Sequence, residues 1–294
     1  MNFLYFLEGI RNPVLDAFFQ LCTYLGQDIP IVLILCILFW CVNKRLAYQI
    51  GLSFFGSGLL LQNLKITFRV DRPWILDPDF KPVASAVPAA TGYSFPSGHT
   101  QSAAALFSTL ALYVKKRGLK VLFVFCFLLV GFSRMYLGVH TPKDVCTAIF
   151  LAVAMSVFVN LLMNHLSDSK RLNGLLALIL AACSAATILY ARILLHRQVI
   201  EEIYALDCCK AAGAGLGFAL GWYLERCHIR FSVEGSLSFQ IKKAVCGLTA
   251  TLLLKLLFKA VLGETIPGEI LQNALLVLWI LAGYPLFIKF FRHS

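Results

Sequence analysis

The sequence predicts an all-α protein, a polytopic transmembrane helical bundle of about nine spans. Composition is the first indication: 59% of the 294 residues are hydrophobic and only 14% are charged, whereas a soluble domain carries about 25% charged residues. The mean hydropathy is +0.78. The second indication is arrangement, because the apolar residues form runs close to the length of about 20 residues with which a helix crosses a bilayer.

Each span is expected where a long apolar run lies between short polar connections. The predicted limits are 26–43, 46–66, 98–115, 119–136, 144–165, 172–195, 205–224, 239–261 and 268–289. Residues 1–25 precede them and carry apolar side chains at helical spacing, which predicts an interfacial helix. The first residues lack a basic stretch and a small-residue cleavage site, so no signal peptide is expected.

Lysine and arginine gather in alternate connections, which are predicted to be cytoplasmic. This bias gives an extracytoplasmic N-terminus and a cytoplasmic C-terminus. The protein is therefore expected in a cell or inner membrane, with several passes through it. The net charge of +11 follows from these loop residues. Since no basic block alternates with aromatic residues in a soluble module, no nucleic-acid partner is expected.

The ten cysteines contain no Cys-x-x-Cys pair, and most lie inside apolar runs. Cysteine acts there as a small hydrophobic residue. Neither a disulfide framework nor a zinc site is expected. No metal ion or cofactor is assigned to the chain.

The segment Pro96-Ser97-Gly98-His99 opens the third predicted span. Ser97 is a natural N-cap, and Gly98 permits close approach of another group to the backbone. A helix N-terminus with free N–H groups is a ready anion site. His99 lies in the first turn, where it could act on a bound anion. An ordinary helix start with an incidental histidine is about equally consistent with this segment alone.

A second segment, from His140 to Asp144, begins the fifth predicted span. Pro142 suits the first helical position, which makes Thr141 the N-cap and Asp144 the third helical residue. The two residues could form a capping box. Alternatively, His140 could attack phosphorus while Asp144 fixes its tautomer, as an acid does for histidine in a catalytic triad. Spacing does not decide whether one aspartate serves both roles.

Three cations, Lys65, Arg72 and Arg134, are predicted at the same membrane face as the two histidines. An arginine fork matches phosphate oxygens bidentately. Any one cation could be an interfacial residue that extends its charged end to water. Three of them beside two histidines indicate phosphate binding, because clamping the phosphoryl oxygens is the expected way to lower the high barrier of phosphate-ester hydrolysis.

In these residues the chain resembles the type 2 phosphatidic acid phosphatase (PAP2) superfamily, whose signature is KxxxxxxRP, PSGH and SRxxxxxHxxxD. Every signature position is matched, over roughly residues 30–165. The matching residues are Lys65, Arg72, Pro73, Pro96, Ser97, Gly98, His99, Ser133, Arg134, His140 and Asp144.

The resemblance implies a core of roughly six helices with its site at the extracytoplasmic surface. It also implies metal-independent hydrolysis through a phosphohistidine. His140 would be the nucleophile, Asp144 its partner and His99 the general acid. The implied phosphate-binding groups are Lys65, Arg72, Ser97, Gly98 and Arg134.

The sequence divides into an N-terminal interfacial segment (1–25), a phosphatase core (26–195) and additional C-terminal transmembrane helices (196–294). The C-terminal helices exceed the family core. They could pack against it or form a homo-oligomer, and the 196–206 connection could instead cap the site. Lys255 and Lys259 lie inside the eighth predicted span without an assigned role.

The leading functional hypothesis is a membrane enzyme that removes phosphate from a lipid phosphate or diphosphate. The candidate substrates are phosphatidic acid, phosphatidylglycerol phosphate and undecaprenyl diphosphate, and membrane lipids are the other expected partners. Trp74, Tyr93 and Tyr136 are expected in an interfacial aromatic belt. Two alternatives remain: a phosphotransferase that uses the same phosphohistidine, and a non-enzymatic lipid transporter.

Overall fold

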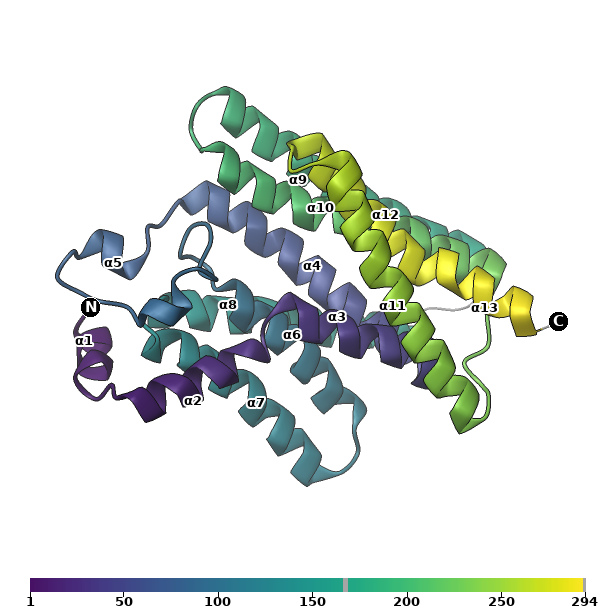
Figure 1. The fold of residues 1–294 in the computed structure, drawn as a ribbon, viewed down its shortest axis with the longest axis horizontal. Coiled ribbons are helices and arrows are strands. Elements are labelled where there is room, and N and C mark those ends of the chain that lie inside the picture. Colours follow the sequence, from purple (N-terminus) through teal and green to yellow (C-terminus); the bar gives the residue numbers. More distant parts are fainter. Residues whose placement is uncertain (166–168, 293–294) are drawn as a thin grey trace. The chain divides into compact units, whose positions relative to one another are not determined.

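A computed structural model describes residues 1–165 and 169–292 (Figure 1). Helices joined by turns and loops make up this part of the chain, and it contains no strand. The α-helices are α1 (Asn2–Gly9), α2 (Pro13–Tyr24), α3 (Asp28–Ile37), α4 (Lys44–Phe68), α5 (Pro73–Leu76), α6 (Gly98–Tyr113), α7 (Arg117–Tyr136), α8 (Pro142–His165), α9 (Lys170–His196), α10 (Glu202–Leu224), α11 (Leu237–Leu262), α12 (Ile266–Leu278) and α13 (Tyr284–Arg292). Short 3₁₀ or π segments are η1 (Leu38–Val42), η2 (Ala84–Ala86), η3 (Glu225–Ile229) and η4 (Trp279–Gly283).

All of the predicted spans are helical, but fewer than nine helices are long and apolar enough to cross a membrane. Among the described residues six are so by themselves, and the pair α2 and α3 with η1, bent by 43°, makes a seventh. The remaining two are α4 and α6. Helix α6 has 16 residues, about 24 Å of rise against a hydrocarbon core of about 30 Å.

Protein surrounds much of α6, which explains its polar sequence. Residues 100–109 of this helix are all buried. Its Gln101 amide donates to Ser57 Oγ of α4 at 2.7 Å and to the Phe54 carbonyl at 3.1 Å. A helix whose polar groups are satisfied by neighbouring helices does not need the hydropathy of one that faces lipid.

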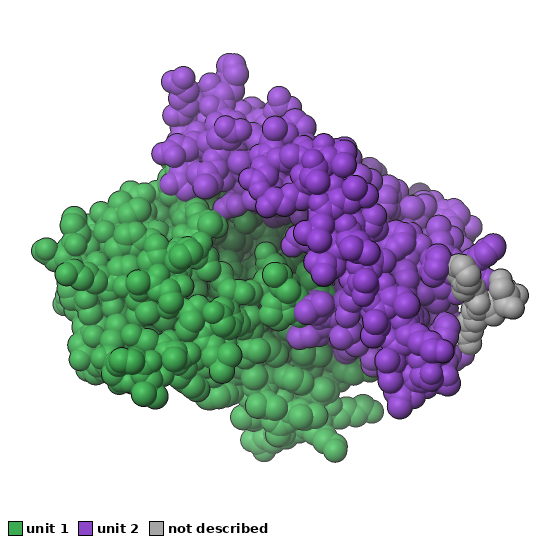
Figure 2. All heavy atoms as spheres, viewed as in Figure 1, with its two compact units in different colours: residues 1–32, 52–160 green, residues 33–51, 161–294 purple. Residues whose placement is uncertain are grey.

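The chain forms two compact units, which Figure 2 shows in separate colours. Unit 1 contains residues 1–32 and 52–160, and unit 2 contains residues 33–51 and 161–294. The sequence boundaries at 25/26 and 195/196 stay a prediction.

In unit 1, the N-terminal residues form two helices in place of the single one expected over 1–25. Asn12 caps α2, since its Oδ1 accepts from the N–H groups of Val14 at 3.1 Å and Leu15 at 3.0 Å. Gly26 lies at the bend between α2 and α3. A Cβ there would lie 2.4 Å from the His99 carbonyl oxygen, so only glycine lets this bend approach the start of α6. The interfacial location of residues 1–25 stays a prediction.

In unit 2, a buried carboxylate ties the segment 33–51 to the later helices. Glu225 Oε1 lies 2.6 Å from Lys44 Nζ, and the Tyr48 hydroxyl donates to the other oxygen. The Trp40 indole N–H also donates to the Ile280 carbonyl at 2.9 Å. These contacts explain why residues 33–51 pack with unit 2 although unit 1 flanks them in sequence.

Two glycines of α10 bring α12 into backbone contact. A Cβ on Gly213 would lie 2.4 Å from the Ile270 carbonyl oxygen, and one on Gly217 would lie 2.2 Å from that of Ala274. Small residues four apart are typical of closely packed transmembrane helices. The sequence contains this pattern, but the apolar runs alone do not predict which helices pack closely.

Gly217→Ala is expected to destabilise unit 2, because the methyl group would force α10 and α12 apart. Overpacking of this kind costs about 1–3 kcal/mol, so the thermal unfolding temperature in detergent should fall. Gly118→Ala is the matched control, since no described atom lies within 4 Å of its Cβ position. An equal unfolding temperature for the two variants would contradict the close packing.

Candidate active site

The predicted site residues all belong to unit 1, where they lie at or next to the ends of five helices, α4 to α8. Lys65 lies in the last turn of α4 and Arg134 in the last turn of α7. The start of α6 supplies Gly98 and His99. Arg72, Ser97 and His140 precede helices, and Asp144 lies in the first turn of α8. Except for partly buried Gly98 and His99, these residues are buried.

Asp144 both caps α8 and contacts His140. Its Oδ2 accepts from the Thr141 N–H at 2.7 Å, and Thr141 Oγ1 accepts from the Asp144 N–H at 3.4 Å. The same Oδ2 lies 3.5 Å from His140 Nδ1. One carboxylate therefore makes both the capping hydrogen bond and the contact with the His140 ring.

Ser94 adds a third contact to Asp144. Its hydroxyl donates to Oδ2 at 2.6 Å, and its N–H donates to the Val70 carbonyl at 2.7 Å. Ser94 therefore joins the long loop before α6 to the His140–Asp144 pair. The sequence does not predict this contact of Ser94, because a loop serine outside the signature has no distinguishing pattern.

Arg72 lies against the other nitrogen of the His140 ring. Its Nη1 is 2.9 Å from His140 Nε2 and 2.9 Å from the Val139 carbonyl. Its Nε and Nη2 donate to the carbonyls of Gly92 at 3.0 Å and Thr91 at 2.6 Å. A guanidinium only donates, so Nε2 is the acceptor nitrogen of the ring. The ring proton then lies on Nδ1, on the side of Asp144.

Arg134 is fully buried and only partly satisfied. Its Nη1 donates to Thr23 Oγ1 of α2 at 2.9 Å. Its Nε and Nη2, and Nε2 of His99, are buried with no hydrogen-bond partner among the described residues. Unpaired donors on a buried charge are costly, and an anion would satisfy them. Thr23 lies outside the signature, and no signal in the sequence marks it.

Ser97 occupies the predicted N-cap position of α6, but its hydroxyl makes a different bond. Its Oγ accepts from the Thr100 hydroxyl at 2.9 Å, and it makes no side-chain capping hydrogen bond. No described atom lies within 4 Å of where a Cβ on Gly98 would stand. The first turn of α6 thus has uncapped N–H groups beside open space, an arrangement suited to an anion.

Two further predicted residues differ in their surroundings. Lys65 is 8% exposed and donates to the Tyr93 carbonyl at 2.6 Å. Tyr136 was expected in an interfacial belt, and this prediction is wrong. It is fully buried, packs against Phe19 with ring centroids 4.2 Å apart, and donates to Asp16 Oδ1 at 2.9 Å. Contacts from α2 cover this tyrosine, and the sequence does not reveal them.

Burial, followed by the positive charges of Arg72, Arg134 and Lys65, holds the pKa of His140 well below its usual range. The imidazole is therefore neutral near pH 7, with its Nε2 lone pair accepting from Arg72. A neutral ring is the form that can act as a nucleophile.

The pKa of His140 predicts a pH dependence of stability. In the unfolded chain histidine takes up a proton near pH 6.5, whereas the folded His140 resists it. As pH falls below about 6.5, the unfolded state binds more protons, so the free energy of unfolding should fall by at most about 1.4 kcal/mol per pH unit from this group. Thermal unfolding between pH 7 and pH 5 measures the loss.

His140→Gln should reduce the loss of unfolding free energy between pH 7 and pH 5. His196→Gln, at an exposed histidine, should leave this loss unchanged. An identical slope for the wild type and His140→Gln would show that the folded His140 titrates normally.

Comparisons with known proteins agree with the signature residues. The family pattern described as "PAP2 superfamily" matches residues 46–168. The pattern described as "PAP2 superfamily phosphatase, transmembrane extension" matches residues 209–293. The first match covers residues 52–160 of unit 1, which hold all the predicted site residues, and the second covers later helices of unit 2.

Individual relatives align with about half of the chain. A probable sphingosine-1-phosphate phosphatase of Dictyostelium discoideum is 29% identical over 50% of this chain, and the alignment spans only 38% of that protein. Phosphatidylglycerophosphatase B of Bacillus subtilis (strain 168) is 30% identical over 46% of this chain and 69% of its own length.

A crystal structure of a transmembrane PAP2-type phosphatidylglycerolphosphate phosphatase from Bacillus subtilis is 25% identical, with a TM-score of 0.48 over 56% of this chain and 85% of that one. With the family pattern, the aligned phosphatidylglycerophosphatase and the complete set of signature residues in one unit, the chain belongs to the PAP2 superfamily of membrane phosphatases.

Proposed function

We propose that this protein is a membrane phosphatase that hydrolyses a lipid phosphate or diphosphate through a phosphohistidine on His140. The observation that carries the proposal is the pairing of an anion-binding group with a nucleophile. Arg134 has two buried donors without a partner among the described residues, and neutral His140 is held between Arg72 and Asp144. Relatives named for phosphatases of a sphingoid phosphate and of phosphatidylglycerol phosphate support the lipid class.

Binding would begin with the phosphoryl oxygens. Lys65, Arg72 and Arg134 supply positive charge, and Ser97 and the Gly98 N–H supply donors at the positive end of α6. Arg72 Nη1 lies 2.9 Å from His140 Nε2. When phosphate arrives, this donor would exchange the ring nitrogen for a phosphoryl oxygen, which frees the lone pair next to phosphorus.

The first chemical step would then form the N–P bond. His99 takes up a proton when the phosphate anion binds beside it. His140 Nε2 then attacks phosphorus, the P–O bond to the lipid alcohol or phosphate breaks, and His99 gives that proton to the leaving oxygen. The ring becomes cationic, and Asp144 stabilises it through Nδ1–H, as an aspartate does in a catalytic triad. Ser94 and the Thr141 N–H keep that carboxylate in place.

The second step would release phosphate. Water loses a proton to His99 as its oxygen attacks phosphorus, and the N–P bond breaks to restore neutral His140. Three cations and a helix N-terminus provide the charge stabilisation that metal ions give other phosphatases. We therefore propose that the reaction needs no metal.

Lipid access and orientation complete the proposal. The lysine and arginine bias of the connections favours a site at the extracytoplasmic face. At a bilayer surface, a lipid could bring its headgroup to the buried cations while its chains stay in the membrane.

Replacement of either histidine should abolish turnover. His140→Ala removes the nucleophile, so phosphate release from detergent-solubilised protein should fall by roughly 10³-fold or more. His99→Ala removes the proposed general acid, worth roughly 10²–10⁴-fold. His196→Ala serves as the control, and EDTA should leave wild-type activity unchanged. Near-normal turnover of either site variant, or a loss with EDTA that added metal restores, would contradict the proposed roles.

A phosphate-release panel should identify the substrate class. Phosphatidic acid, phosphatidylglycerol phosphate, undecaprenyl diphosphate and a sphingoid phosphate are compared with soluble glucose 6-phosphate. At least one lipid is expected to exceed the soluble ester in kcat/KM. Preference for glucose 6-phosphate would rule out lipid specificity, and phosphate transfer to an added alcohol in place of release would identify a phosphotransferase.

The same panel tests the orientation of the site. In sealed right-side-out vesicles, a short-chain substrate that does not cross the membrane should be hydrolysed without lysis. Activity that begins only after the vesicles are opened would place the site on the cytoplasmic face.

A further inference from the structure

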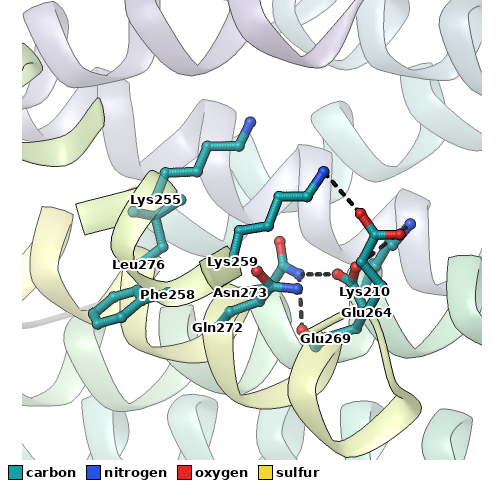
Figure 3. Close-up of a pocket in the computed structure, with 9 residues that line it drawn as sticks. All are labelled: Lys210, Lys255, Phe258, Lys259, Glu264, Glu269, Gln272, Asn273 and Leu276. Atoms are coloured by element: carbon teal, nitrogen blue, oxygen red, sulfur yellow. Dashed lines mark hydrogen bonds and ion pairs between the residues drawn. The ribbon is translucent and has the colours of Figure 1, made fainter. Parts of the chain in front are cut away.

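Unit 2 contains a charged cavity of about 310 Å³. Side chains from α10, α11 and α12 and from the turn between α11 and α12 line it (Figure 3). Its charged residues are Lys210, Lys255, Lys259, Glu264 and Glu269. The three lysines exceed the two glutamates, so the lining has an excess of positive charge.

The glutamates of this cavity already have partners. Lys259 Nζ lies 2.7 Å from Glu264 Oε1 and holds the pKa of that carboxyl below its usual range. Glu269 is 7% exposed, accepts from the Asn273 amide at 3.1 Å and lies 3.8 Å from Lys210 Nζ. Both acids are therefore occupied in neutralising two of the lysines.

Lys255 is the cation that remains. It makes no hydrogen bond or ion pair within the described ranges 1–165 and 169–292. Figure 3 shows its side chain extending in the same direction as that of Lys259, one helical turn away. Glu264 pairs with Lys259 on the side away from Lys255, so the charge of Lys255 is left for an anion to neutralise.

The depth of Lys255 argues that this anion is part of a lipid. The residue precedes the end of α11 at Leu262 by seven positions (255 to 262), or about 10 Å of helix, and α11 is a candidate span with a mean hydropathy of 1.9. Ionisable residues inside spans are unfavourable and usually functional. Around it on α11, Leu252, Leu256 and Val261 are 58%, 58% and 71% exposed, a surface suited to acyl chains.

We propose that this cavity binds the phosphate group of an anionic membrane lipid, with Lys255 and Lys259 as its cationic partners and the apolar surface of α11 against its chains. The Gln272 amide, which also lines the cavity, can donate to a phosphate oxygen. The site is separate in sequence from the histidine site of unit 1. It goes beyond the proposed phosphatase activity and does not depend on it.

Photocrosslinking tests this site directly. The probe is a phosphonate analogue of phosphatidic acid, which a phosphatase does not hydrolyse, with a diazirine in one acyl chain. The full chain is labelled in neutral-lipid nanodiscs, and labelled peptides are mapped by mass spectrometry. Label is expected within residues 252–276. Each of Lys255→Gln and Lys259→Gln should lower it about fivefold, the factor that corresponds to about 1 kcal/mol for one cation at a membrane surface.

Control variants and probes distinguish the contributions of lysine charge, acyl chain and phosphate group to the labelling. Lys255→Arg keeps the charge and should keep the label, as should Lys242→Gln, at an exposed lysine near the other end of α11. A diacylglycerol probe with the same diazirine should label the region weakly. Labelling of 252–276 that is absent, insensitive to both glutamine variants or equal for diacylglycerol would overturn the proposal. Complete competition by inorganic phosphate at the probe's own concentration would also overturn it, because the site would then bind free phosphate.

Discussion

Unit 1 buries three cations near the ring of His140, and this constraint shapes the loop that precedes α6. Lys65, Arg72 and Arg134 are at most 8% exposed, and like charges this close repel in a medium of low dielectric constant. Backbone carbonyls offset part of the cost: those of residues 91–93 accept from Arg72 and Lys65. The loop that precedes α6 therefore supplies backbone acceptors to two of the three cations.

Asp144 connects the loop before α6 to His140, the predicted nucleophile. A single carboxylate oxygen faces the ring of His140, the hydroxyl of Ser94 and the N–H of Thr141, so the start of α8, the loop and the histidine share one fixed point. The backbone contributes as well, because the Ser97 N–H donates to the Asp144 carbonyl at 3.2 Å. Asp144 therefore contacts the start of α6 next to His99 and also contacts His140. The distance between the two histidines depends on this residue more than on the chain between them.

Sequence predicted what depends on residue type and spacing. Apolar runs located the helices, and the signature located residues that unit 1 gathers into one site. It did not predict what depends on neighbours distant in the chain. Thr23 and Ser94 are ordinary hydroxyl residues until Arg134 and Asp144 approach them, and Tyr136 is buried by α2 together with loop residues such as Ala86. Helix α6 was predicted as a span from composition, and its residues 100–109 are buried within the protein.

The bend at Gly26 has a consequence for how this fold can be divided. The family pattern begins at residue 46, yet the backbone at Gly26 contacts the carbonyl of His99, and Thr23 accepts a hydrogen bond from Arg134. Helix α2 and the bend at Gly26 therefore support His99, the proposed acid, and the buried Arg134. A chimera made by transplanting only the family segment into another scaffold would carry every signature residue but lack the support that aligns two of them.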